Sequence, residues 1–281
     1  MMEIIKLLGI GMILGISNVI PGVSGGTMAV VFNVYERLLS VITINVKKIL
    51  SEWKFVLPLG LGVVFGIIIF SKVITYLFNF YPVPTNMFFC GLITGSIPLI
   101  LRKIPGRRTQ KLKPSIIICL LAAFALMTVM LLLSPEESSI IYTDMSFSLF
   151  IRLFVSAALA AVAMIIPGIS GSFLMIVLGM YTTIIASVSN MNIPFLIPVA
   201  LGVMFGLLFG ARLVTFLMSR VPAQTYGAIL GLVAGSLLLI FPWRGFVESY
   251  EEGLLIIISA VSAVSALIGF FLAYASSKNE T

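Results

Sequence analysis

The sequence predicts an all-α integral membrane protein built from two inverted repeats. Three observations lead to this prediction: the composition, the distribution of positive charge and a motif that occurs twice. Of the 281 residues, 60% are hydrophobic and only 10% are charged, and the mean hydropathy is +1.20. A soluble domain carries roughly 25% charged residues. Apolar runs long enough to cross a hydrocarbon core of about 30 Å recur along the chain.

The positive charge predicts how the chain is oriented in the membrane. The net charge is +7, and six cations gather in one loop between apolar segments: Arg102, Lys103, Arg107, Arg108, Lys111 and Lys113. By the positive-inside rule this loop faces the cytoplasm, and its cations also attract anionic headgroups of the bilayer. Aromatic residues do not interleave with the cations, so no nucleic-acid partner is expected. Counting crossings outward from the loop places the N- and C-termini in the cytoplasm.

The same count divides the chain into two halves of one plan. Each half is a long apolar hairpin, interrupted in the middle by Pro-Gly-x-Ser-Gly, followed by three membrane spans. The first half, residues 1–133, has its hairpin at 4–43 and its spans at 56–80, 84–101 and 115–133. The second half, residues 148–281, has its hairpin at 148–189 and its spans at 196–220, 223–241 and 253–275. The hairpin arms have about 17–20 residues, or about 25–30 Å of helix. Re-entrant and fully crossing hairpins both fit that length.

The two interruptions are copies of one another. The first break, Ile20–Gly26 (IPGVSGG), matches the second break, Ile166–Ser172 (IPGISGS), at an offset of 146 residues. Further on, PLGLGVVFG from Pro58 aligns with PVALGVMFG from Pro198 at an offset of 140, so the loop between the motifs absorbs six residues. Each half makes an odd net number of crossings, which inverts the second copy. Inverted repeats with interrupted segments are the design of secondary transporters, whose site lies where the breaks meet near the midplane.

Glycine pairs at GxxxG-like spacing also repeat between the halves. Small residues at this spacing let two membrane helices approach closely. We therefore expect a packing role, not a binding role, for Gly62/Gly66, Gly91/Gly95, Gly202/Gly206 and Gly231/Gly235.

The breaks carry the candidate binding residues. Proline and clustered glycines free backbone groups from helical pairing, which cavity-lining chain tolerates and lipid-facing chain does not. Hydroxyls and N–H groups at helix openings donate to anions. The pattern predicts a phosphate or carboxylate site formed by Ser24, Gly25, Gly26 and Thr27 of the first copy and Ser170, Gly171 and Ser172 of the second. Asn18, just before the first break, is a further candidate. The alternative is a packing hinge whose serines bond back to their own helices.

Two cations lie deepest within predicted spans. Lys72 and Arg212 are paired by the second register of the repeat. A cation inside a membrane costs roughly 3 kcal/mol or more and usually faces a polar cavity, so both are predicted to contact the anion. Snorkelling to the interface is the alternative. Glu36 and Arg37 follow the first break near the cytoplasmic mouth. Glu36 is the candidate for proton coupling there, and interfacial charge is the alternative.

No catalytic site, metal site or cofactor is expected. Histidine is absent, and Cys90 and Cys119 lie inside apolar segments without metal or redox spacing. An intramembrane lipid phosphatase needs a nucleophile with a base or a metal. The sequence offers neither, so an enzyme is the least favoured class.

The paired motifs SNVIPGVSGGTMAVVFNVYERLL and AMIIPGISGSFLMIVLGMY resemble the polyprenyl-phosphate transporter family (PopT type), over nearly the whole chain. The resemblance implies a flippase of the bacterial plasma membrane that returns undecaprenyl phosphate, a carrier lipid for wall-polymer precursors, from the outer to the inner leaflet. The copies differ at Asn33 and Gly179, so the two arms need not be functionally equal. The residues alone indicate an inverted-repeat carrier with an anion-friendly centre, and a carrier of a small soluble anion stays open. The oligomeric state is not predicted.

Overall fold

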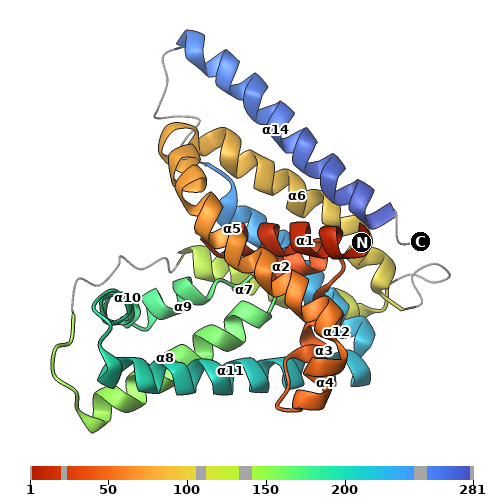
Figure 1. Cartoon of the computed structure of the whole chain (residues 1–281). Coiled ribbons are helices and arrows are strands. Elements are labelled where there is room, and N and C mark those ends of the chain that lie inside the picture. Colours follow the sequence, from red (N-terminus) through yellow and green to blue (C-terminus); the bar gives the residue numbers. More distant parts are fainter. Residues whose placement is uncertain (1, 20–23, 106–111, 133–140, 244–251, 279–281) are drawn as a thin grey trace.

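The computed structural model describes residues 2–19, 24–105, 112–132, 141–243 and 252–278 (Figure 1). Every regular element in these ranges is an α-helix. Among them, six helices are long and apolar enough to cross a membrane, or seven if the bent pair α9 and α10 forms one span. The prediction of an all-α membrane protein is confirmed.

The helices of the first half follow the predicted plan with one addition, a short helix before the first long span. In order they are α1 (Met2–Val19), α2 (Gly25–Val31), α3 (Tyr35–Val41), α4 (Val46–Ser51), α5 (Trp53–Phe80), α6 (Pro82–Lys103) and α7 (Pro114–Leu132). Helix α6 begins with proline, whose missing N–H costs nothing at the first helical position.

The second half has no counterpart of that short helix. Its helices are α8 (Phe147–Ile165), α9 (Gly171–Val177), α10 (Tyr181–Ser189), α11 (Ile193–Arg220), α12 (Pro222–Ile240) and α14 (Glu252–Lys278). Helix α12 begins with proline, as α6 does.

The helix bounds follow the register of the sequence repeat. Helices α2 and α9 begin at positions 146 residues apart, at Gly25 and Gly171, and so do α3 and α10, at Tyr35 and Tyr181. Helices α2 and α9 each have 7 residues, and α5 and α11 each have 28. The six additional residues of the first half match the length of α4, which has 6 residues. The inversion of one half relative to the other stays a prediction.

Helix pairing also corresponds between the halves. Helix α1 packs along α5, and α8 packs along α11 in the lower part of Figure 1. The next helices pack across the two halves: α6 of the first half packs along α14 of the second, and α12 of the second half packs along α7 of the first. Helices α6 and α12 also contact each other. The two halves therefore interlock and do not form separate domains.

Glycines make these close pairings possible, as the sequence predicts. A Cβ atom added to Gly62 would collide with the carbonyl oxygen of Leu8 in α1, and one added to Gly202 would collide with that of Phe154 in α8. The other two helix pairs have the same arrangement, with Gly91 against Ala266 of α14 and Gly231 against Leu120 of α7. Small residues allow backbones to approach to this degree, so the packing role of these glycines is confirmed.

The hairpins are asymmetric in their two arms. The first arm is one helix, α1 or α8, whereas the second arm consists of two short helices. The axes of α9 and α10 differ by 115°. At the corresponding turns, Asn33 has φ 55° and Gly179 has φ 66°, both in the left-handed region. Asparagine tolerates that region better than most residues, so the Asn33/Gly179 difference leaves the turn backbone alike.

Helix α2 occupies the centre of the molecule (Figure 1). Its residues from Gly26 to Val31 are all buried, and Met28 to Val31 belong to the largest cluster of buried apolar side chains. Helices α7 and α14 instead leave most of their apolar surface outside, as lipid-facing helices do. Helix α2 of the first hairpin therefore lies inside the protein and away from lipid.

Candidate functional site

The two breaks meet, although more than 140 residues separate them. The backbone N–H of Gly168 donates a 2.7 Å hydrogen bond to Thr27 Oγ1, and the Tyr35 hydroxyl donates a 2.9 Å bond to the carbonyl of Ile165. Gly26 lies so close to the end of α8 that an added Cβ would come within 3.0 Å of the carbonyl oxygen of Met164. We call this contact of α2 and α3 with the end of α8 the junction. Residues 20–23 of the first break lie outside the described residues.

Gly168 is required at the junction for two reasons. Its φ of +92° is a conformation that side-chain-bearing residues rarely adopt. An added Cβ would also lie 2.7 Å from the carbonyl oxygen of Leu232 in α12. This backbone conformation aims the N–H of Gly168 at Thr27. The glycine of the second break therefore serves the contact between the two copies.

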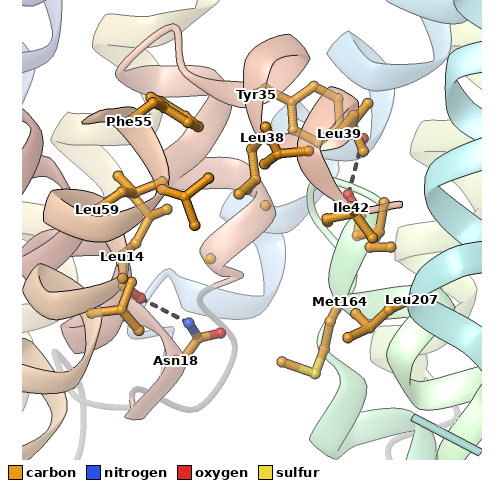
Figure 2. A pocket seen from close by; sticks show the side chains of 17 residues that line it. Leu14, Asn18, Tyr35, Leu38, Leu39, Ile42, Phe55, Leu59, Met164 and Leu207 are labelled. Carbon is orange, nitrogen blue, oxygen red and sulfur yellow. Dashed lines mark hydrogen bonds between the residues drawn. The ribbon is translucent and has the colours of Figure 1, made fainter. Parts of the chain in front are cut away.

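A cavity of about 330 Å³ lies beside the junction (Figure 2). We call it the break cavity. Its walls are mainly aliphatic and come from α1, α3, α5, α8 and α11, and they include Leu38, Leu59 and Leu207. Its polar end is formed by Asn18, Gly25 and Gly26.

Asn18 is fixed at that polar end. Its side-chain Nδ2 donates a 2.9 Å bond to the carbonyl of Leu14, as the dashed line in Figure 2 shows. The Asn18 amide lies against Gly25, where an added Cβ would be 2.9 Å from both Nδ2 and Oδ1. A cavity with one polar end and apolar walls is suited to the headgroup end of an amphiphile.

The serines of the breaks do not bond back to their own helices. Ser24 precedes α2 in extended conformation and is 5% exposed, and its Oγ has no hydrogen-bond partner within the described residues. Ser170 Oγ and Ser172 Oγ lie 2.8 Å apart. Elsewhere, Ser17 and Ser96 do donate to their own helices. The alternative interpretation of the breaks is a packing hinge whose serines hydrogen-bond to their own helices. Within the described residues, the observed geometry does not show such bonds for Ser24, Ser170 or Ser172.

Thr27 contacts the second break. It is 1% exposed, and its Oγ1 accepts the hydrogen bond of Gly168, so it links the copies and does not face the cavity. Gly171 packs against α8, where an added Cβ would lie 2.7 Å from the carbonyl oxygen of Ala160. Of the residues predicted at the breaks, Asn18, Gly25 and Gly26 line the cavity, and Ser24, Thr27, Ser170 and Ser172 do not. Anion binding at the breaks stays a prediction.

Of the two predicted intramembrane cations, Arg212 lies apart from the break cavity. Arg212 is exposed on α11 and lines a second pocket, near α4. Lys72 belongs to α5, but its side chain lies outside the described residues. The structure thus does not bring Arg212 into one cluster with the serines.

Glu36 and Arg37 are both paired. Lys103 Nζ lies 2.7 Å from Glu36 Oε1, and the Tyr226 hydroxyl donates to the same oxygen. Arg37 bonds Glu52 at 2.8 Å and stacks over the ring of Phe55 at 4.4 Å. Together these contacts tie α3 to α6, α12 and α5.

Ionisation of Glu36 follows from this pairing. The residue lies on α3, outside the helices long enough to span the membrane. Burial raises the pKa of the Glu36 carboxyl, but the hydrogen bonds from Lys103 and Tyr226 lower it, and the net shift is downward. An ionised, paired carboxylate favours the interfacial-charge interpretation over proton coupling.

Comparison with known proteins places the chain in a family. Residues 14–256 match the family described as VCA0040-like, undecaprenyl phosphate translocase-like. The chain belongs to this family. No solved structure matches it.

Two curated relatives of this translocase-like chain are named polyprenyl-phosphate transporter. The Vibrio cholerae protein is 30% identical over 248 residues, covering 83% of this chain and 76% of the relative. The Staphylococcus aureus protein is 29% identical over 239 residues, covering 83% of this chain and 84% of the relative. These names indicate a transporter and not an enzyme. The described residues contain no group of three or more His, Cys, Asp or Glu that could hold a metal.

Sequence reasoning missed several residues of the candidate site. Tyr35 had a usable signal, because it recurs as Tyr181 at the offset of the breaks. The position of Lys103 in the cationic loop indicates only topology, although Lys103 pairs with Glu36 in the structure. For Tyr226 the sequence gives no signal, because its partner lies 190 residues away on another helix.

Proposed function

We propose that this chain moves undecaprenyl phosphate between the leaflets of the bacterial plasma membrane, so that the carrier lipid is used again. The observation that carries the proposal is the break cavity, with its polar end at the junction and its apolar walls. The names of the family and of the two relatives support the same substrate class. The cavity accepts the headgroup end of the lipid, and the rest of the chain stays in the bilayer.

The phosphate group needs donors because a charge is very costly to bring into hydrocarbon unpaired. The junction supplies Ser24, whose Oγ is buried without a partner among the described residues, and the adjoining Ser170–Ser172 pair. Helices α2 and α9 have only 7 residues each, so we ascribe the donation to hydroxyls and N–H groups more than to long helix dipoles. Arg212 supplies a cation away from the junction, and Lys72 is the second predicted cation; one headgroup reaches them at other stages of transport.

Transport by alternating access follows from the repeat. If the halves are inverted, a motion of one half relative to the other exposes the junction first to one leaflet and then to the other. The junction contacts are few and local: the Thr27–Gly168 bond, the Tyr35–Ile165 bond and the close approach of Gly26. They are therefore the contacts that we expect to change between states.

Reconstitution tests the proposal. Purified protein in liposomes should move a fluorescent polyprenyl phosphate between leaflets faster than protein-free liposomes do, and excess unlabelled polyprenyl phosphate should compete. The same proteoliposomes should not take up radiolabelled inorganic phosphate or a short organic phosphate. Uptake of the soluble anion without lipid movement would replace the proposal by a carrier of small anions.

A further inference from the structure

A second pocket lies between the end of the first hairpin, α4 and α11. Its volume is about 350 Å³, and we call it the α4 pocket. In contrast to the break cavity, it has a polar lining that includes Ser40, Thr43, Lys48, Arg212, Thr215 and Ser219. Two cations and four hydroxyls from three segments of the chain thus surround one space.

The cations of the α4 pocket have no acidic partner in the part of the chain that the structure describes. Within the described residues, no carboxylate lies at salt-bridge distance from Lys48 or Arg212. The nearby Arg37 and Lys103 do have such partners, Glu52 and Glu36. Two unpaired cations lining one pocket produce a positive potential that a bound anion would neutralise.

Two of the hydroxyls are also available as donors. Ser40 and Ser219 donate to the carbonyls of Arg37 and Phe216 on their own helices. Thr43 Oγ1 accepts a bond from the N–H of Asn45, which leaves its own hydrogen free to donate. Among the described residues, the Thr43 and Thr215 hydroxyls have no acceptor. The pocket therefore offers two cations and two hydroxyl donors.

The α4 pocket adjoins the break cavity. Leu39 and Ile42 line both spaces. An anion leaving the polar end of the break cavity along α3 would next meet Lys48 and Arg212. The α4 pocket thus lies on a route from the junction toward the face that the charge distribution predicts to be cytoplasmic.

The pocket is built by the one element that the second half lacks. Arg212 and Thr215 have repeat partners, Lys72 and Thr75, at an offset of 140. Lys48 lies on α4, and the second half passes from α10 to α11 without such a helix. The repeat alone would give the two faces matching sites. Lys48 adds a cation to one face only.

We propose that the α4 pocket binds a phosphate monoester group, with Lys48 and Arg212 as its cations and Thr43 and Thr215 as hydroxyl donors. On the proposed function, on which this identification of the ligand rests, the group is the headgroup of the transported lipid at the face predicted to be cytoplasmic. A tetrahedral dianion accepts charge-assisted bonds from both cations at once. Because α4 is not repeated, the protein binds the headgroup more tightly at this face than at the other.

Equilibrium binding to the full chain in nanodiscs tests the pocket. The probe is polyprenyl phosphate, and the variants are Lys48→Gln, Lys48→Arg and Lys47→Gln. Lys47 is the matched control, because it neighbours Lys48 on α4, is exposed and does not line the pocket. We expect Lys48→Gln to weaken binding by roughly 3- to 10-fold, since the lost contact is charge-assisted but partly exposed to solvent.

The controls separate the pocket from general surface charge. Lys47→Gln should bind as the wild type does, and Lys48→Arg should keep most of the affinity. Equal affinities of Lys48→Gln and Lys47→Gln would overturn the proposal.

Parallel arms identify the source of the phosphate group. Inorganic phosphate that binds as tightly as the lipid, with the same loss in Lys48→Gln, would assign the pocket to free phosphate. Weak or absent binding of inorganic phosphate assigns it to the lipid headgroup. If wild-type protein moves no lipid in liposomes but binds phosphate groups through Lys48, the pocket stands and the proposed function fails. If wild-type protein moves the lipid and Lys48→Gln binds it as tightly as Lys47→Gln does, phosphate binding in the α4 pocket is rejected and the proposed function is kept.

Discussion

The backbone N–H of Gly168 donates a 2.7 Å hydrogen bond to the side-chain oxygen of Thr27, 141 residues away. The two partners belong to the two copies of the repeated motif, yet Thr27 has no hydroxyl counterpart, because Phe173 occupies its position in the second copy. The bond is therefore an asymmetric contact within a duplicated element. It fixes the relative position of the breaks in the conformation seen here.

Removal of the Thr27 hydroxyl should weaken the junction. The Thr27→Val substitution keeps the shape of the side chain and leaves the buried N–H of Gly168 without its acceptor, at a cost of roughly 1–3 kcal/mol. We expect a lower apparent Tm of the purified protein and a changed rate of lipid movement. Thr128→Val is the control, because that hydroxyl bonds only the carbonyl of Phe124 in its own helix. Equal Tm values for the two variants would contradict the importance of the link.

Substitution of the packing glycines should separate helices. Gly62→Ala and Gly202→Ala place a methyl group on a backbone oxygen of the neighbouring helix, and such overpacking costs roughly 1–3 kcal/mol or more. Gly9→Ala is the matched control on α1, where an added Cβ meets nothing within 4 Å. Thermal unfolding in detergent should show a clear loss of stability in the first two and little change in the third. Equal stability of all three variants would show that these helices separate without cost.

Glu36 should stabilise the protein as a charged group. Its pKa is lowered from the ordinary value of 4.5, so the stability it contributes is present above that pH and is lost as the pH falls through the lowered pKa. The difference in apparent Tm between wild type and Glu36→Gln should thus be constant from pH 6 to pH 8, and it should shrink below the ordinary pKa of 4.5 as the pH falls through the lowered pKa. Glu3→Gln, which removes a long 3.9 Å contact with Arg37, is the control.

The same variant tests proton coupling at Glu36. Because the residue is already ionised at neutral pH, the shape of the transport–pH profile between pH 6 and pH 8 should be the same in wild type and Glu36→Gln. A profile that flattens in the variant would restore Glu36 as the proton carrier.

If the two halves are inverted, equivalent loops should be exposed on opposite sides of the membrane. In a variant without Cys90 and Cys119, the single replacements Lys47→Cys and Asn190→Cys both lie at exposed positions, before α5 and α11. An impermeant thiol reagent should label position 47 from the cytoplasmic side and position 190 from the outside. Labelling of both from one side would contradict the inverted repeat.

Much of the fold could be predicted because membrane chains obey simple constraints. The long helices lie within about three residues of the predicted spans, since an apolar run of this length has no alternative to a helix in lipid. The repeat also gave the register in which Gly62 and Gly202 pack. The exchange of α6 and α12 between the halves could not be predicted, because apolar faces of membrane helices carry little information about their partners.

The candidate site was less predictable from the sequence than the fold. The motif located the junction, but not which hydroxyl links the copies and which stay available: Thr27 and Ser24 look alike in sequence and differ only in what lies beside them. Lys48 lies in a short amphipathic segment, and in the sequence its charge indicates only a position at the membrane interface. Its place beside Arg212 follows from the turn between α3 and α4, which no periodicity reveals.

Movement of polyprenyl phosphate past the junction is the central claim, and a variant that fills the break cavity tests it most directly. Leu38 lines that cavity (Figure 2), whereas Leu159 of α8 is 44% exposed and does not. The measurement is the initial rate of lipid movement in proteoliposomes for wild type, Leu38→Trp and Leu159→Trp, each checked for folding by its Tm. We predict a rate near the protein-free background for Leu38→Trp and near wild type for Leu159→Trp. A folded Leu38→Trp protein that moves the lipid at the wild-type rate would contradict the account, as would a wild type no faster than protein-free liposomes.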